Sequence, residues 1–273
     1  MRRHIVDDSR AVLRLSGPDV RSFLQDLVTA DVGRLEAGRA VYAALLTPQG
    51  KYLFDFLLVA DGEDVLVDVA ADRAAALAQR MTMYRLRRKV EIAPTDIKPV
   101  LIWPGEGPAP AEVAIPDPRD ARLGWRLYGA ADGIAAGPGT RAEYEALRIA
   151  LGIPESGVEL IPEESYILEA GFERLHGVDF RKGCYVGQEV TARMKHKTEL
   201  RKGLARVTVD GPPPPPGTEI LCDGRVAGKL FSVAGGQGLA QLRRDRIAGA
   251  LQAGEARIAV TGFVMDDEPQ PAG

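Results

Sequence analysis

The chain has 273 residues, of which 45% are hydrophobic and 27% are charged, and its formal net charge is -3. This balance is typical of a soluble globular protein and excludes a surface built uniformly for nucleic acid or membrane lipid. The length allows one large domain or two modest ones. No apolar run approaches the roughly 18 residues of a membrane span, and the N-terminus is too polar for a secretory signal. We therefore expect a cytoplasmic protein without a membrane segment.

The first hundred or so residues predict a mixture of strands and helices. A candidate cap, Ser16, precedes a helix whose apolar stripe consists of Val20, Phe23, Leu24, Leu27 and Val28. A second helix is expected over residues 72–87. Strands are expected over residues 11–15, 41–47, 52–59, 65–69, 89–93 and 99–103. This strand meander with its helices indicates α+β organisation.

The middle of the chain contains the best-delimited helix. Five prolines between residues 104 and 118 predict a loop crossing, and residues 124–128 predict a short strand. Thr140 and Glu143 then form a T-x-x-E capping box, and Gly152 is expected to end the helix that follows.

The C-terminal part predicts a small β-barrel or sandwich, because short alternating strands follow one another there. Cys222 lies in one of these strands and is expected in the core. A stiff loop is expected over Pro212 to Pro216, and the acidic tail from Asp266 to Gly273 is expected to be disordered. The strands are expected over residues 204–209, 219–222, 226–233 and 256–260.

The other cysteine lies in the segment Lys182-Gly183-Cys184-Tyr185-Val186-Gly187-Gln188-Glu189. Glycines on both sides of Cys184 allow a tight turn and a close approach to its sulfur. Arg181, Lys182 and a helix expected from Gln188 onward would favour thiolate over thiol. We interpret Cys184 as a reactive or metal-ligating sulfur rather than a small buried hydrophobe. With no C-x-x-C pair, neither a disulfide framework nor a complete protein-built metal site is expected.

This segment resembles the K-G-C-[FY]-x-G-Q-E signature of the YgfZ family, folate-binding proteins related to the aminomethyltransferase (T-protein) of the glycine cleavage system. The resemblance covers most of residues 10 to 205 and is compatible with a β-rich end. Other segments similar to that family, in the same order, are Gly17-Pro18-Asp19 through Phe23-Leu24-Gln25, Thr47-Pro48-Gln49-Gly50-Lys51, Tyr84-Arg85-Leu86-Arg87, Ile161-Pro162-Glu163-Glu164-Ser165 and Leu168-Glu169-Ala170-Gly171.

The resemblance implies a GcvT-like folate-binding ring of mixed α/β subdomains over residues 1–200, a β-barrel over 201–265 and a disordered tail over 266–273. Tetrahydrofolate would lie in the central cavity. The family is implicated in iron–sulfur cluster assembly or repair, including clusters of tRNA-modifying enzymes, and its mitochondrial relatives act beside A-type carriers. Cys184 would then be the single ligand offered to a cluster shared with a partner, and Lys182 would keep the sulfur charged.

The chain departs from the aminomethyltransferase at the catalytic acids. Where that enzyme has two adjacent carboxylates, this chain has Asp55 alone, with Phe54 in place of the second acid. Asp55 could act as a desolvated acid or base, or could face outward from its strand. The departure favours a folate-binding accessory protein, with a folate-dependent aminomethyl or C1-transfer enzyme as the alternative.

Five residues are candidates for folate contacts. Arg148 interrupts the apolar face of the capped helix, near a place where the methyltransferase family has an arginine. Glu169 could accept from pterin N–H groups, and Tyr84 and Tyr185 could stack on the ring. Gln188 is the amide of the signature. The alternatives are a helix-surface arginine and ordinary core tyrosines.

Two basic runs, Arg80 to Lys89 and Arg193 to Lys202, stand out against the net charge of -3. They could hold the glutamate tail of folate, an acidic partner protein or RNA. We favour the first two, because Tyr84 alone supplies an aromatic ring for base stacking in either run. Direct nucleic-acid binding is therefore not expected, and the protein is expected to be a monomer or to form a transient heterodimer.

Overall fold

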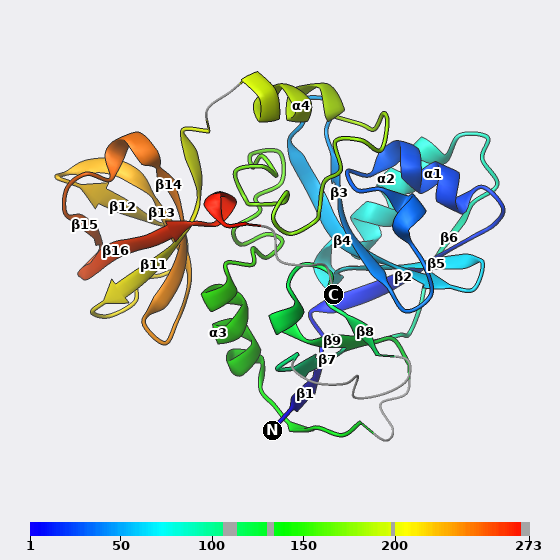
Figure 1. Cartoon of the computed structure of the whole chain (residues 1–273), viewed down its shortest axis with the longest axis horizontal. Coiled ribbons are helices and arrows are strands. Elements are labelled where there is room, and N and C mark those ends of the chain that lie inside the picture. Colours follow the sequence, from blue (N-terminus) through cyan, green and yellow to red (C-terminus); the bar gives the residue numbers. More distant parts are fainter. Residues whose placement is uncertain (106–113, 130–133, 198–199, 269–273) are drawn as a thin grey trace.

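The computed structural model describes residues 1–105, 114–129, 134–197 and 200–268. Three β-sheets surround a central segment, residues 153–187, that contains no helix or strand, in a ring-like arrangement (Figure 1). In this view a closed barrel lies on the left, a five-stranded sheet with two helices on the right, and a second five-stranded sheet below.

The first sheet forms in the order β3-β4-β5-β2-β6, with antiparallel neighbours throughout. Helices α1 (Val20–Leu27) and α2 (Ala74–Arg85) pack against it in one apolar core. The strands are β2 (Arg10–Ser16), β3 (Ala40–Leu46), β4 (Tyr52–Asp61), β5 (Asp64–Ala70) and β6 (Glu91–Pro94). The meander predicted for this region is therefore present.

Helix α1 buries the predicted stripe, since Val20, Phe23, Leu24 and Leu27 are all in the core. The predicted cap is wrong. Ser16 is the last residue of β2, and Asp19 occupies the cap position without a side-chain cap bond. The Asp19 carboxylate instead accepts a hydrogen bond from the Lys89 backbone N–H at 2.7 Å, because the following chain returns beside the helix.

The second sheet has the order β10-β1-β7-β9-β8 and includes the N-terminal strand. Helix α3 (Arg141–Leu151) follows it with the predicted capping box of Thr140 and Glu143, and left-handed Gly152 ends the helix. The strands are β1 (Arg3–Val6), β7 (Val100–Trp103), β8 (Ile115–Pro116), β9 (Trp125–Leu127) and β10 (Gly137–Pro138). Part of the predicted proline-rich loop, residues 106–113, lies outside the described residues.

The barrel closes in the order β11-β14-β13-β12-β15-β16, so the terminal part is a barrel rather than a sandwich. Its interior is filled by side chains such as Val207, Ile220 and Leu230. Cys222 packs against this core but is only half-buried. The strands are β11 (Lys202–Asp210), β12 (Thr218–Cys222), β13 (Arg225–Ala234), β14 (Gln237–Arg243), β15 (Leu251–Ala253) and β16 (Ala256–Phe263).

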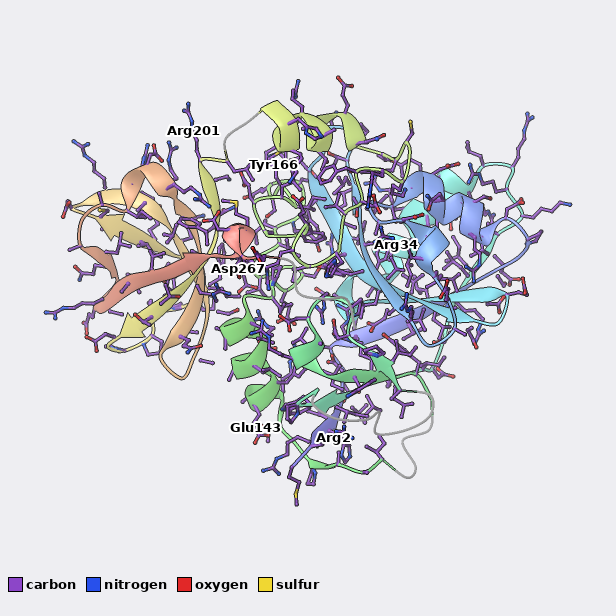
Figure 2. All side chains as sticks on the ribbon, in the orientation of Figure 1. Arg2, Arg34, Glu143, Tyr166, Arg201 and Asp267 are labelled. Atoms are coloured by element: carbon purple, nitrogen blue, oxygen red, sulfur yellow. The ribbon has the colours of Figure 1, made fainter. Side chains whose placement is uncertain are left out.

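The barrel is attached to the rest of the protein by several contacts. The Leu204 N–H donates to the Glu169 carbonyl oxygen at 2.7 Å, and Ile149 of α3 packs against Leu204 and Val264. Asp267, which lies between the barrel and the other parts (Figure 2), accepts hydrogen bonds from both terminal nitrogens of Arg206.

The C-terminal tail differs in part from the expectation of disorder from Asp266 onward. Asp266 and Asp267 form ion pairs with arginines, and residues 269–273 lie outside the described residues.

The remaining helices are short. Helix α4 (Gln188–Lys197) follows the central segment, and single 3₁₀ turns occur at Val32–Arg34, Ala71–Arg73, Ala121–Leu123, Arg244–Arg246 and Val264–Asp266. Over the ranges that the structure describes, none of the helices combines the length and the apolar character needed to cross a bilayer.

Candidate functional site

The signature segment forms a turn that precedes α4 and is locked onto the β3–β4 turn by two glycines. A Cβ on Gly187, where φ is 85°, would lie 2.6 Å from the Thr47 carbonyl oxygen. A Cβ on Gly50 would lie 2.8 Å from Cβ of Val190 in α4. Only glycine permits this approach of two backbones. The turn that contains Cys184 is therefore fixed relative to the first sheet.

Lys182 anchors the other side of the same turn. Its Nζ donates to the Val28 carbonyl oxygen at 2.8 Å and to the Gln25 carbonyl oxygen. Gln25 lies in the last turn of α1, where its carbonyl has no partner within the helix, and Val28 is the extended residue that caps the helix end. Burial lowers the pKa of Lys182, although nearby carboxylates, Asp31 first among them, act in the opposite direction. The signature lysine is thus a structural cation at the negative end of a helix dipole.

Two side chains that the sequence did not single out as site residues hold the backbone around Lys182. The Gln25 amide nitrogen donates to the Lys182 carbonyl oxygen at 3.2 Å, while its oxygen accepts from Val32 N–H at 2.8 Å. The Asp179 carboxylate accepts from the Arg181 backbone N–H at 2.7 Å. Gln25 is 157 positions from Lys182, so no local pattern marks it, whereas the Asp179 contact joins residues two positions apart in a local Asx-type turn.

Cys184 projects from this fixed turn and is exposed, with a free thiol. The neighbouring Tyr185 is buried in the central core, and burial raises its pKa to about 12. The Lys182 ammonium lies 5.0 Å from the centre of the Tyr185 ring. Gln188, half-buried, opens α4 with its N–H donating to the Tyr185 carbonyl oxygen at 3.2 Å. Lys182, Cys184, Tyr185 and Gln188 are therefore brought together in one turn.

The turn offers one soft ligand. Within the described ranges, no group of three or more histidine, cysteine, aspartate or glutamate side chains is arranged to hold a metal ion. A single exposed thiolate can complete the coordination of an iron–sulfur cluster only when other ligands come from elsewhere.

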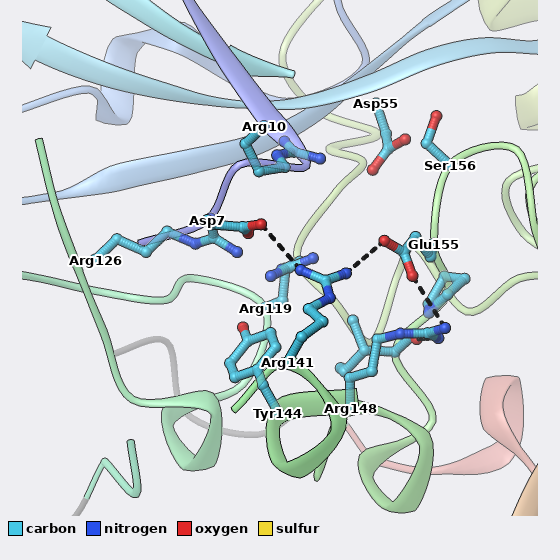
Figure 3. Close-up of a pocket in the computed structure, with 12 residues that line it drawn as sticks. Asp7, Arg10, Asp55, Arg119, Arg126, Arg141, Tyr144, Arg148, Glu155 and Ser156 are labelled. Atoms are coloured by element: carbon cyan, nitrogen blue, oxygen red, sulfur yellow. Dashed lines mark hydrogen bonds and ion pairs between the residues drawn. The ribbon is translucent and has the colours of Figure 1, made fainter. Parts of the chain in front are cut away.

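Asp55 and Arg148 line a different place, a small cavity between the two open sheets and α3 (Figure 3). Asp55 is buried and faces inward, so the outward-facing alternative is wrong. It accepts from the Tyr52 hydroxyl at 2.7 Å and from the Tyr42 hydroxyl at 3.0 Å. Burial, reinforced by the charge of Asp55, raises the pKa of both tyrosines well above the usual range.

Arginine–aspartate pairs fill one side of this cavity. Asp68 binds Arg10 at 2.6 Å and Arg126 at 3.0 Å, and Asp117 binds Arg119 and Arg126. Burial alone would raise the pKa of Asp117, but the two arginines hold it well below its usual range. These charges are mutually satisfied, as buried charges must be.

Arg148 and Arg141 close the other side. Arg148 binds Glu145 at 2.7 Å, Glu155 at 3.0 Å and Glu159 at 3.3 Å. Its Nη2 also donates to Ser232 Oγ of the barrel at 2.7 Å. Arg141 bridges Asp7 at 3.0 Å and Glu155 at 2.7 Å (Figure 3). The Arg148 side chain therefore connects α3 to the central segment and to the barrel.

The remaining folate candidates do not line this cavity. Glu169 is buried near Lys202, whose Nζ lies 3.5 Å from it, and burial raises the pKa of Glu169. Tyr84 lies in a groove beside α1, and Tyr185 and Gln188 belong to the signature turn. The five residues are thus distributed over several places.

The cavity has a volume of about 30 Å³, enough for about one water, whereas small-molecule pockets are usually about 300 to 1,000 Å³. Its carboxylate and arginines are suitable partners for a pterin and for the glutamate tail of folate. Its size is not. In this conformation the cavity does not fit a pterin, because the ion pairs of Arg141 and Arg148 occupy the space.

Comparison with known proteins identifies relatives of the whole chain. The chain is 34% identical to the iron-sulfur cluster assembly factor IBA57, mitochondrial, of Mus musculus over 97% of its length and 85% of the relative. The protein of the same name from Homo sapiens is 34% identical over 95% of this chain and 83% of the relative. Residues 201–263 match the family described as CAF17, C-terminal beta-barrel domain.

The fold has a solved counterpart. The glycine cleavage system aminomethyltransferase T from Bartonella henselae superposes with a TM-score of 0.75 at 12% identity, over 100% of this chain and 88% of that chain. The expected aminomethyltransferase-like fold with a terminal β-barrel is confirmed.

These relatives also correct one prediction and refine another. The expected cytoplasmic location is wrong, because the relatives are named as mitochondrial proteins and so indicate mitochondria instead. The resemblance noted from the signature is confirmed at the level of an iron–sulfur assembly protein with this fold. On the strength of 34% identity along nearly its whole length, the chain belongs to the IBA57 family of iron–sulfur cluster assembly factors.

Proposed function

We propose that this protein supports iron–sulfur cluster assembly or repair by offering Cys184 as one ligand of a cluster shared with a partner. The observation that carries the proposal is an exposed thiol on a turn that is locked by Gly187 against Thr47 and by Lys182 against Val28. A fixed, exposed sulfur can be presented to another protein without a cost for ordering the turn.

The partner we propose is an A-type iron–sulfur carrier, which would supply the other ligands, and the clients include tRNA-modifying enzymes. This part rests on the signature resemblance to the YgfZ family and on the names of the relatives. Sharing of one cluster requires contact for the time of transfer only, so we propose a monomer that forms a transient heterodimer, without direct binding to nucleic acid.

Tetrahydrofolate is the proposed small-molecule ligand of the region that we assign to residues 1–200, with 201–265 as the barrel domain. The aminomethyltransferase-like fold supports a folate-binding accessory role. Because the ion pairs of Arg141 and Arg148 with Glu155 fill the cavity beside Asp55, folate binding there requires that these pairs open. Arg141→Ala should therefore tighten the binding of a reduced folate measured by calorimetry, and unchanged or absent binding would count against this cavity.

Folate-dependent C1 transfer is not favoured as the function. Phe54 stands in place of the second acid, and both oxygens of Asp55 accept hydrogen bonds from tyrosines. The relatives are named assembly factors rather than transferases.

The proposal is tested by anaerobic cluster reconstitution, followed by absorption and circular dichroism, in a mixture of this protein and a purified A-type carrier. We expect a cluster spectrum that neither protein gives alone. Cys184→Ser should abolish it, and the matched variant Cys222→Ser should preserve it. A mixed spectrum that is unchanged in Cys184→Ser would refute the role of this thiol.

A further inference from the structure

A groove with a volume of about 790 Å³ runs between α1 and the turn that follows α2. It is much larger than the cavity beside Asp55, and it opens to the surface. Apolar and charged side chains share its walls, among them Phe23, Asp26, Leu27, Tyr84, Arg88 and Val186.

Leu86, at the edge of this groove, is 86% exposed and has a φ of 51° with a ψ of -112°. An L-residue with a γ-branched side chain rarely adopts such a backbone conformation, and strained residues of this kind concentrate at functional sites. The turn is held in place by Arg85, whose Nη1 donates to the Val90 carbonyl oxygen at 2.9 Å. Three positions earlier, Met83 is 58% exposed. The fold therefore exposes Met83 on the last turn of α2 and Leu86 on the fixed turn that follows the helix.

The charges beside Leu86 are unbalanced in favour of cations. Asp26 already pairs with Arg88, and Asp19 accepts from the Lys89 backbone. In the part of the chain that the structure describes, the guanidinium of Arg87 and the ammonium of Lys89 have no ion-pair partner, and both residues are exposed. A partner that covers Leu86 would therefore be favoured if it brought carboxylates.

The groove is continuous with the turn that holds Cys184. Val186, two positions after Cys184, forms part of its wall. At the same end, Lys182 binds the carbonyl oxygens of Gln25 and Val28. These two residues flank the groove residues Asp26 and Leu27 in the sequence. A protein bound in the groove would thus reach the exposed thiol.

We propose that this groove binds an acidic segment of the same carrier protein that completes the cluster on Cys184. An apolar side chain of that segment covers Leu86. The inference rests on the proposed function and adds the surface by which the partner is recognised. Leu86 supplies the apolar contact, Arg87 and Lys89 supply the charge complementarity, and the shared wall at Val186 sets the carrier's cluster ligands beside Cys184.

The test is anaerobic calorimetry of a purified A-type carrier with this protein, in parallel with cluster reconstitution. The variants are Leu86→Gly, which suits the positive φ and so preserves the fold, and Arg87→Glu. Matched controls on the barrel are Leu221→Ser, at a site that is 38% exposed, and Arg257→Glu, at an exposed site. We expect each groove variant to weaken binding about tenfold or more and each control to change it less than about twofold.

The outcomes separate the two proposals. Wild-type affinity and cluster yield in both groove variants would overturn the docking surface and leave the shared cluster standing. A wild-type pair that forms no cluster would overturn the proposed function and the docking inference with it. Self-association that Leu86→Gly abolishes, together with unchanged carrier affinity, would show that the groove binds a second copy and would also overturn the inference.

Discussion

The Lys182 ammonium donates to the Val28 carbonyl oxygen at 2.8 Å and so joins the turn that holds Cys184 to the C-terminal end of α1. The two residues are 154 positions apart in the sequence. This contact makes the geometry of the thiol depend on a helix that also forms the wall of the docking groove.

Lys182→Met should therefore destabilise the fold as well as the site. It leaves two helix-end carbonyls without their charged donor, so we expect the free energy of unfolding to fall by about 1 to 3 kcal/mol. Urea denaturation measures the change. Lys195→Met, which removes an exposed pair with Glu173, is the control and should cost less than about 1 kcal/mol. Equal losses in the two variants would contradict an anchoring role for Lys182.

The two glycines of the signature should differ in their tolerance of a side chain. Gly183 has a φ of 97° and open space at its Cβ position, so Gly183→Ala should cost only about 1 to 2 kcal/mol of backbone strain. Gly187→Ala adds a clash with the Thr47 carbonyl oxygen and should cost about 2 to 5 kcal/mol. Urea unfolding gives both values, and a smaller loss for Gly187→Ala would disprove the docking of the two turns.

Lowering the pH should reduce the free energy of unfolding, because Asp68 and Asp117 become protonated. Burial opposes ionisation, but paired arginines keep the pKa of each carboxyl below its ordinary value. The folded state therefore binds fewer protons than the unfolded state, and this stabilisation is present above about pH 4 and is lost as pH falls through the folded pKa values.

Asp68→Asn should remove part of that pH dependence and leave Arg10 and Arg126 buried without their carboxylate. We expect a loss of about 3 to 5 kcal/mol at neutral pH, and a shallower decline in stability toward low pH. Urea unfolding at several pH values measures both effects, and a decline as steep as that of the wild type would contradict this assignment.

Asp55→Asn tests whether the buried Asp55 carboxylate takes part in cluster formation. The amide keeps one acceptor oxygen for the tyrosines, so we expect stability to fall by about 1 to 3 kcal/mol and cluster formation with a carrier to remain within about twofold of the wild type. Reconstitution at a temperature where the variant is folded measures this. Loss of cluster formation by a folded variant would show that Asp55 takes part.

Local chemistry was enough to predict several elements. Helix α3 begins and ends where its capping box and Gly152 predicted, because caps act within one helical turn. Strands β14 (Gln237–Arg243) and β15 (Leu251–Ala253) were missed. Both are stabilised by pairing with a strand distant in the sequence, β14 with β11 and β15 with β12, and β15, with three residues, has little local signal.

The site was predictable only in part, because most of the contacts that form it join residues that are far apart in the sequence. Glycines and the cysteine marked the signature turn, but the partners of Lys182 lie on a distant helix. Arg148 was a folate candidate because its surroundings were unknown; Glu155 and Glu159 meet it only after the chain turns at Gly152, and Ser232 meets it only after the barrel docks. Long-range charge pairing has no sequence period that could reveal it.

The most direct test of the shared cluster is anaerobic native mass spectrometry of this protein mixed with an A-type carrier and reconstituted. We predict a heterodimer whose mass includes one cluster, seen with the wild type and Cys222→Ser but absent with Cys184→Ser. A cluster-containing heterodimer of undiminished abundance in Cys184→Ser would contradict the claim that this thiol is a cluster ligand.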